Sequence, residues 1–145
     1  MSARVPASAG TPTATWRSSA TSWRARFLQV WIIPETRRIP RSYDQKVYAD
    51  GDKRDRLTLI GSKDGRDGSI AFQQDVAIFA SILSPDRTIE YRAAAGRGLW
   101  LQIARGAVTA NGTRLDEGDG LALENEGALT IRAVSEAEFL LFDLA

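Results

Sequence analysis

The segment YRAAAGRGLWLQIARGAVTANG, residues 91–112, decides the fold. Successive side chains of a strand point to opposite faces, so Leu99 and Ile103 share one face and Trp100 lies on the other. Both faces are partly apolar. Asn111-Gly112 is a strong hairpin signal because both residues tolerate positive φ. The segment therefore predicts strands of a β-barrel or sandwich joined by a tight turn.

The chain from Phe27 onward continues this pattern of short strands separated by Gly, Asp and Pro turns. No segment keeps a 3.6-residue apolar period long enough to predict a helix. We predict an all-β antiparallel fold, and the glycine corners at 106, 112 and 118 favour a jelly-roll barrel or sandwich. The expected strands lie near residues 27–33, 57–60, 69–72, 76–83, 88–93, 99–110, 114–123, 128–134 and 138–144.

The composition of the 145-residue chain excludes several classes of chemistry, because it contains neither histidine nor cysteine. Zinc, copper, nickel and non-haem iron sites depend on imidazole or thiolate ligands. Ser-His-Asp and Cys-His catalysis are excluded for the same reason. The absence of cysteine suits a reducing compartment, so we expect a cytoplasmic protein. No apolar run reaches the ~18 residues of a membrane span, so no membrane role is expected.

Residues 1–26 differ in composition from the rest of the chain. They contain four arginines and no acidic residue, whereas the whole chain has 19 Lys and Arg against 18 Asp and Glu. The remainder is therefore mildly acidic and lacks the basic patch that nucleic-acid binding requires. The plain interpretation of 1–26 is a disordered tail, and an organelle transit peptide is the alternative. We place the folded domain at 27–145.

The opening segment resembles the first metal-binding motif of the cupin family, a His-x-His pair and a glutamate before a glycine hairpin. Anchoring the last glycine of that motif on Gly106 puts the histidine positions on Ala93 and Ala95 and the glutamate position on Leu99. The second motif, aligned on the following Gly-Asp corner, puts its histidine position on Leu129. We call these four positions the ligand slots. The resemblance implies that they pack a barrel interior and bind no metal.

Four segments, RFLQVWIIPETRRIPRSYDQKVY, DGRDGSIAFQQDVAIFASIL, LWLQIARGAVTANGTRLDEGDGLAL and EFLLFDL, cover about Phe27 to Leu144. In this order they resemble the C-terminal half of the pirin family. Pirins are two-cupin proteins, and some bacterial members act as quercetinases. In that family iron or another divalent metal sits in the N-terminal cupin, held by three histidines and a glutamate, so the resemblance implies no cofactor in this chain.

The N-terminal segment departs from the family pattern. Ala9-Gly10-Thr11 is similar to a Gly-Thr-Gly stretch that precedes the C-terminal cupin, but the His-Ser-Glu that supplies two metal ligands does not follow. A truncated or frame-shifted reading of a pirin gene would give this result, and a single-domain relative with an unrelated tail is the alternative.

Three groups of residues are candidates for functional sites. Asp116, Glu117 and Asp119, like Asp64 and Asp67, have oxygen ligands for calcium or magnesium, but both clusters are typical of solvated turns. The segment 63–68 is glycine-rich and basic without the spacing of a phosphate loop. Trp100 is compatible with lining a pocket for a flat ligand, although core or interface packing is the ordinary role. We assign no catalytic, cofactor-binding or metal-binding residue.

The sequence leaves two main functional hypotheses. In the first, the chain is a metal-free, non-catalytic cupin domain with a structural or interaction role. In the second, it belongs to a quercetin 2,3-dioxygenase-like enzyme whose metal-bearing cupin is absent from this chain. The apolar stretch Phe27–Ile33 is the expected surface for self-association or for a partner cupin, because an apolar strand at a sheet edge invites pairing. The small-molecule ligand stays unknown.

Overall fold

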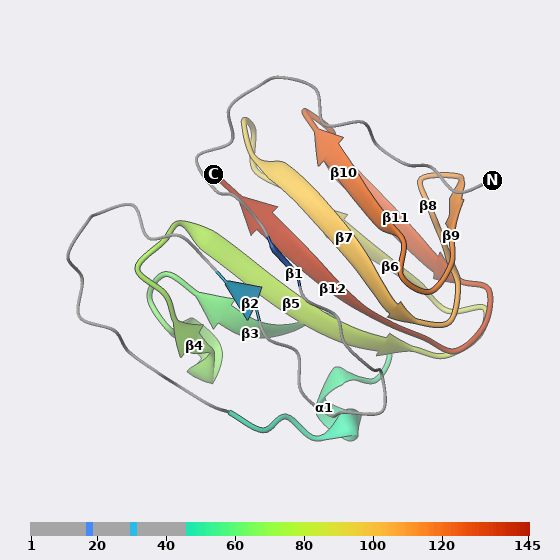
Figure 1. The fold of residues 1–145 in the computed structure, drawn as a ribbon, viewed down its shortest axis with the longest axis horizontal. Helices are drawn as coiled ribbons and strands as arrows, with labels where there is room; N and C mark the ends of the chain where they lie inside the picture. The colour runs from blue at the N-terminus through green and yellow to red at the C-terminus, as the bar shows by residue number, and fades with distance from the viewer. Residues whose placement is uncertain (1–16, 19–29, 32–45) are drawn as a thin grey trace.

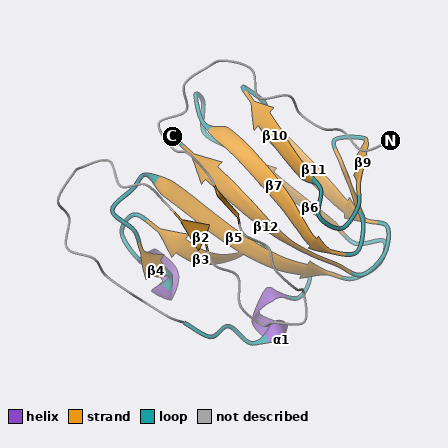
Figure 2. Cartoon of the chain, viewed as in Figure 1, coloured by secondary structure: helices purple, strands orange, loops and turns teal. Residues whose placement is uncertain are grey.

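The computed structural model describes residues 17–18, 30–31 and 46–145, and two sheets make up most of this part (Figures 1 and 2). The six-stranded sheet has the order β10-β7-β12-β5-β3-β4, and the four-stranded sheet has the order β6-β11-β8-β9. The strands are β3 (Thr58–Ser62), β4 (Ile70–Ala71), β5 (Val76–Leu83), β6 (Thr88–Arg92), β7 (Gly98–Arg105), β8 (Val108–Ala110), β9 (Thr113–Leu115), β10 (Gly120–Glu124), β11 (Ala128–Ala133) and β12 (Ala137–Leu144).

The expected all-β fold is confirmed, with local differences in its first half. β3 runs on into the segment that the sequence predicts as a loop, because Gly61 and Ser62 pair with β4. This pairing is parallel, whereas we expected antiparallel strands throughout. Two short helical segments also occur, α1 (Asp50–Lys53) and the 3₁₀ turn η1 (Arg66–Gly68). Neither contains enough residues to show an apolar period, so sequence patterning cannot reveal them.

The main core lies between the two sheets. In β7 the residues Leu99, Leu101 and Ile103 point inward and are buried, as the alternation predicts. In β11 the burial alternates strictly along the strand, so that only one face of the four-stranded sheet is covered. The fully buried members of this core include Leu83, Leu101, Ile103, Val108, Leu115, Leu129, Ile131, Phe139 and Leu141.

A second apolar cluster lies on the opposite face of the six-stranded sheet. Its buried members are Val76, Ile78, Ala80, Leu140 and Phe142, and partly buried residues pack against them. Because β5 and β12 contribute to both clusters, they are buried on both faces. Their sequences are accordingly almost continuous runs of apolar residues.

Trp100 packs in this outer cluster and not in the space between the sheets. The interpretation in which it lines a pocket inside the barrel is therefore wrong. A Cβ added at Gly120, its neighbour on β10, would overlap the Trp100 ring, so the glycine makes room for the indole.

The turns between strands follow the glycine pattern. Asn111 and Gly112 have φ values of 45° and 84°, which confirms the predicted two-residue hairpin between β8 and β9. Gly106, with φ 76°, lies where the chain crosses from β7 of one sheet to β8 of the other. A Cβ at Gly106 would overlap the Glu136 carbonyl oxygen, so the close backbone approach requires glycine there.

The N-terminal predictions fall almost wholly outside the described residues. Within 1–45 the structure describes two short strands, β1 (Arg17–Ser18) and β2 (Val30–Trp31), which pair antiparallel. The domain boundary at residue 27 and the association surface Phe27–Ile33 therefore stay predictions. In the described part of the chain, no helix is long and apolar enough to cross a membrane.

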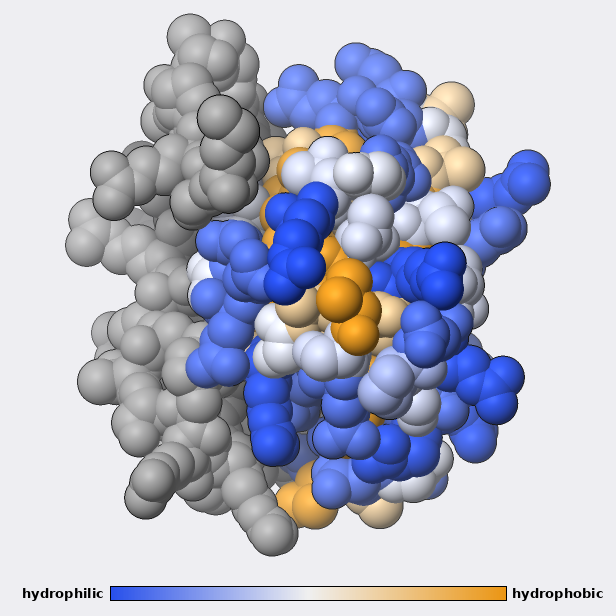
Figure 3. All heavy atoms as spheres, turned by 90° about the vertical axis from the view of Figure 1, so that its right-hand side faces the viewer, coloured by the Kyte–Doolittle hydropathy of each residue, from blue (hydrophilic) through white to orange (hydrophobic). Residues whose placement is uncertain are grey.

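The surface of the described domain is largely polar. Figure 3 shows one side of the molecule, where hydrophilic residues surround a small apolar group near the centre. Among the described residues, the large hydrophobic side chains that are strongly exposed are Val47 and Val134. Singly exposed apolar residues of this kind are ordinary on protein surfaces and indicate no site by themselves.

Candidate functional site

Three of the four ligand slots, Ala93, Leu99 and Leu129, lie in or against the core between the sheets. Leu99 on β7 is paired with Asp143 on β12, and Leu129 on β11 is paired with Tyr91 on β6. Leu99 and Leu129 are buried members of the main core, and Ala93 packs against it. Ala95 is exposed, which corrects the expectation that all four slots face the interior, because the strand β6 ends at Arg92 before this position.

The side chains at the slots do not fit a transition metal. Alanine and leucine offer no nitrogen, sulfur or oxygen donor, and the family's ligand set needs imidazole and carboxylate. Among the residues that the structure describes, no group of three or more His, Cys, Asp or Glu side chains comes together to hold an ion. The interior at this level is instead filled by apolar packing.

A polar group of four residues closes the barrel at the same level, and we call it the mouth bridge: Asp75, Tyr91, Arg97 and Asp143. The Tyr91 hydroxyl donates a hydrogen bond to Asp143 Oδ2, and Arg97 Nε donates to Asp143 Oδ1. Arg97 Nη1 donates to Asp75 Oδ2 at 3.1 Å, and Arg97 Nη2 donates to the Asp143 carbonyl oxygen at 3.1 Å. The bridge therefore ties β6 of one sheet to β12 of the other.

Burial governs the electrostatics of this bridge. The side chain of Asp143 is 7% exposed and that of Arg97 is 21% exposed. Burial and then the hydrogen bond to Asp143 raise the pKa of Tyr91, so this phenol stays protonated well above its usual range. Burial alone would lower the pKa of Arg97, but the bonds to Asp143 and Asp75 raise it. The buried carboxylate is thus held between one hydroxyl and one guanidinium, as a buried charge requires.

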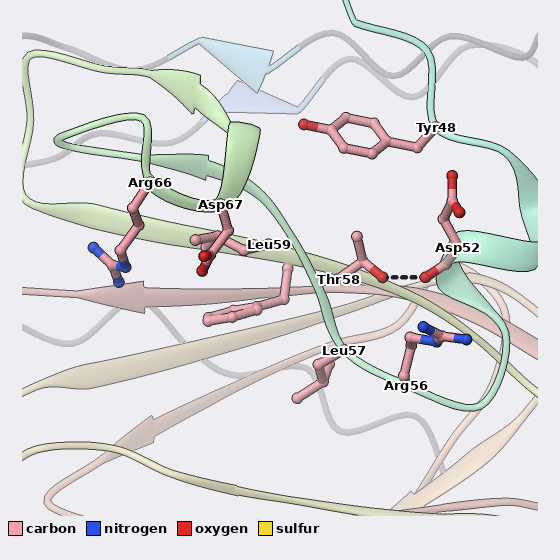
Figure 4. Close-up of a pocket in the computed structure, with 9 residues that line it drawn as sticks. Tyr48, Asp52, Arg56, Leu57, Thr58, Leu59, Arg66 and Asp67 are labelled. Carbon is pink, nitrogen blue, oxygen red and sulfur yellow. Dashed lines mark hydrogen bonds between the residues drawn. The ribbon is translucent and has the colours of Figure 1, made fainter.

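A hollow opens beside the mouth bridge, on the edge of the six-stranded sheet (Figure 4). The Phe79 ring, which lines it, lies 5.1 Å from the Tyr91 ring at an interplanar angle of 59°. In Figure 4, Arg66 and Asp67 lie on one side of the hollow and Tyr48, Asp52 and Arg56 lie on the other. Its nine lining residues are Tyr48, Asp52, Arg56, Leu57, Thr58, Leu59, Arg66, Asp67 and Phe79.

Asp116 and Asp119, between β9 and β10, form an ordinary turn. Asp116 Oδ1 accepts hydrogen bonds from Arg114, and the Asp116 N–H donates to Asp119 Oδ2 at 2.9 Å. In the other acidic loop, Asp64 Oδ1 accepts from Ser62 Oγ and from Arg66. Both sets of contacts satisfy local backbone and side-chain donors, as the turn interpretation expects.

Sequence reasoning missed the mouth bridge, although one signal was present. Asp143 is a charged residue inside the apolar run EFLLFDL, at the alternate position that faces the core with Phe139 and Leu141. A carboxylate at such a position is almost never fully buried without a partner. Its partners lie 46 and 52 residues away in sequence, so no local pattern identifies them.

Comparison with known proteins gives a consistent result. The family model described as the quercetinase C-terminal cupin domain matches residues 59–144. The quercetin 2,3-dioxygenase of Escherichia coli K12 is 38% identical over 121 residues, which are 83% of this chain and 51% of that protein. A pirin-like protein of Caulobacter vibrioides is 29% identical over 121 residues, 83% of this chain and 52% of that protein.

Solved structures show the same partial coverage. The crystal structure of YhhW from Escherichia coli superposes with a TM-score of 0.76 at 37% identity, covering 81% of this chain and 49% of that one. The nickel(II) complex of the same bacterial pirin gives a TM-score of 0.75 at 38% identity, with the same coverage. The two sheets are therefore those of a cupin-type jelly roll. The chain spans about half the length of the curated relatives it matches.

Proposed function

Since the chain belongs to the pirin family and matches its quercetinase C-terminal cupin domain, we propose that it is a metal-free, non-catalytic cupin that supports a metal-bearing partner cupin. The observation that carries this proposal is the chemistry of the ligand slots. Ala93, Leu99 and Leu129 belong to the apolar interior, and the whole chain has no histidine or cysteine to replace them. No reaction step is assigned to residues of this chain.

The supporting role follows from how the barrel is closed. A metal held by strands of both sheets would cross-link them, and here the mouth bridge provides the link at the same level through Tyr91 and Asp143. Hydrogen bonds to a buried, charged group are stronger than neutral ones. A barrel closed in this way needs no ion for its rigidity. A cytoplasmic location, which suits a chain without cysteine, is part of the proposal.

A second candidate function rests on the relatives. The Escherichia coli protein that is 38% identical over the matched half is a quercetin 2,3-dioxygenase. This favours a role for the chain as one part of a quercetin 2,3-dioxygenase-like enzyme whose metal-bearing cupin lies outside this sequence. The two candidates differ in whether this domain affects the reaction itself or only the stability of the other half.

Quercetin oxidation by the purified chain and by a chimera tests both candidates. In the chimera, the matched half of the Escherichia coli relative is replaced by the corresponding residues of this chain. We expect no oxidation by the chain alone, and a chimera that folds, retains its metal and oxidises quercetin. Oxidation of quercetin by the chain alone would contradict the non-catalytic role.

The kinetic constants of the chimera separate the two candidates. A change confined to thermal stability favours a supporting role, whereas a fall in kcat with unchanged stability and metal content favours participation in the reaction. A folded chimera that cannot retain metal would contradict the supporting role.

A further inference from the structure

The hollow beside the mouth bridge has the dimensions of a ligand site. Its volume is about 460 Å³, within the range of roughly 300–1,000 Å³ that is usual for small-molecule pockets. It is open to solvent over much of its surface. No residue of it belongs to the mouth bridge or to the ligand slots, so it is distinct from the features that carry the proposed function.

The floor of the hollow is apolar and partly aromatic. Leu57, Leu59 and Phe79 are all partly buried, and two of them, Leu57 and Phe79, also pack against the main core. Tyr48 faces this floor and is fixed by a hydrogen bond from its hydroxyl to the Ile60 carbonyl oxygen at 3.2 Å. The faces of such side chains suit a flat apolar molecule, since aromatic rings stack or pack edge to face.

One wall of the hollow is a preformed loop. Gly65, Asp67 and Gly68 have φ values of 67°, 55° and 70°, all in the left-handed region. Lys46 Nζ donates a hydrogen bond to the Gly68 carbonyl oxygen. This bond connects the loop to segment 46–49, which carries Tyr48 on the other side of the hollow. A non-glycine residue held with positive φ carries a local strain, and such strain concentrates at functional sites.

The charges on the rim leave one cation without a counter-ion. In the part of the chain that the structure describes, Arg56 makes no ion pair and is exposed. Arg66 is held by Asp64 at 3.2 Å, and Asp52 Oδ2 accepts a hydrogen bond from the Ala49 N–H. Asp67 is the opposing charge on the far wall. Arg56 is therefore the group best able to bind an anion, and a guanidinium pairs with a carboxylate through two parallel bonds.

We propose that the hollow binds a small molecule with a flat aromatic body and one carboxylate, the ring lying on Leu57, Leu59 and Phe79 and the carboxylate on Arg56. Asp67 on the far wall, and Asp52 on the same side as Arg56, then act against binding through their negative charges (Figure 4). The site goes beyond the supporting role of the domain and does not depend on it, because neither the metal-bearing cupin nor the slots take part.

Titration of the full chain with 2-naphthoate, followed by ¹H–¹⁵N NMR, tests the proposal. We expect saturable shifts that cluster at residues 48, 56–59, 66–67 and 79. The neutral analogue 2-naphthalenemethanol, which keeps the ring and lacks the charge, is expected to bind about tenfold more weakly, as the loss of a charge-assisted pair predicts. Absence of saturable shifts, shifts confined to other residues, or equal affinity for the two probes would each overturn the proposal.

Two variants with opposite expected signs sharpen the test. Arg56→Gln removes the cation and is expected to weaken 2-naphthoate binding about tenfold. Asp67→Asn removes the opposing charge and is expected to strengthen it about twofold, and asparagine tolerates the left-handed conformation at this position. Arg92→Gln, an exposed arginine on β6 outside the hollow, is the control and should leave the affinity unchanged.

The signs of these effects decide the role of charge. Effects of the same sign for Arg56→Gln and Asp67→Asn, or an Arg92→Gln variant that weakens binding as much as Arg56→Gln, would overturn the assignment to Arg56. If Arg56→Gln does not fold, the comparison of the charged and neutral probes on the unaltered chain still decides the proposal. This outcome is independent of whether the chain binds metal or supports a partner cupin.

Discussion

The outer faces of the two sheets differ in how far they are buried. In the four-stranded sheet, β6 and β11 alternate between inward-facing, covered residues and outward-facing, exposed ones. In the six-stranded sheet, β5 and β12 are buried along nearly their whole length, and the outer cluster around Phe142 adds a second packed layer. One sheet is thus made to face water, and the other is made to be covered on both sides.

This difference indicates which surface of the domain serves packing and which serves solubility. An outer face made of Val76, Ile78, Ala80, Leu140 and Phe142 would be costly to expose, at roughly 25 cal/mol for each Å² of apolar surface. These five residues are at most 8% exposed, so this face is already covered.

The largest expected effect tests whether the outer cluster is as well packed as the core. Phe142→Ala removes a ring that is 5% exposed, and we expect it to lower the free energy of unfolding by about 3–4 kcal/mol. Thr130→Ala, on the exposed face of β11, is the matched control and should cost less than about 1 kcal/mol. Urea unfolding of the two variants measures both. Equal, small effects would show that the two outer faces do not differ.

The next effect concerns the bridge between the sheets. Asp143→Asn removes the buried charge that Tyr91 and Arg97 share, and we expect a loss of about 2–3 kcal/mol in the free energy of unfolding. Asp75→Asn removes the other partner of Arg97, whose side chain is 44% exposed, and should cost less than about 1 kcal/mol. The reverse ranking would contradict the role of Asp143 as the centre of the mouth bridge.

Substitutions at two glycines compare the crossing between the sheets with a turn within one sheet. Gly106→Ala places a methyl group against the Glu136 carbonyl oxygen as well as straining the backbone, so we expect a loss of about 2 kcal/mol. Gly112→Ala meets no atom within 4 Å and should lose only about 1 kcal/mol from its positive φ. Thermal unfolding monitored by circular dichroism measures the difference. A larger loss at Gly112 would mean that the crossing is not the tighter site.

The smallest effect is a dependence of stability on alkaline pH. The pKa of Tyr91 is raised in the folded protein, so its contribution is complete below its ordinary value of about 10 and is lost as pH rises toward the folded value. We expect this fall to amount to less than about 1 kcal/mol, because water partly screens the side chain. The Tyr91→Phe variant should show a shallower fall above that pH. Identical pH profiles for the two proteins would contradict the claim that burial and Asp143 keep Tyr91 protonated.

The fold was largely predictable from sequence because strands leave local signatures. The Asn111-Gly112 hairpin and the alternation from Leu99 to Ile103 appear in the structure as expected. The exposed position of Ala95 was not predictable, since a motif alignment fixes the spacing and cannot tell where β6 ends. Alternation places Trp100 on the face opposite Leu99, as the structure shows, but which face lies inside the barrel depends on sheet packing.

The candidate sites were harder to predict because their residues are far apart in sequence. Asp143 gives a local signal as a charge in an apolar run, but Tyr91 and Arg97 become its partners only once the sheets are packed. The hollow combines the arm at Tyr48 and Arg56, the loop at Asp67 and the strand residue Phe79. No spacing rule joins these segments, so only tertiary structure reveals the site.

The metal content of the purified full chain tests the central claim most directly, since the claim is that apolar packing and the mouth bridge take the place of a metal at the ligand slots. The chain would be incubated with iron(II) or nickel(II), desalted and examined by elemental analysis, with thermal unfolding measured in parallel with and without a chelator. The account predicts far less than one equivalent of metal per chain and an unchanged unfolding temperature. About one equivalent per chain, with an unfolding temperature that falls when the chelator removes it, would contradict the account.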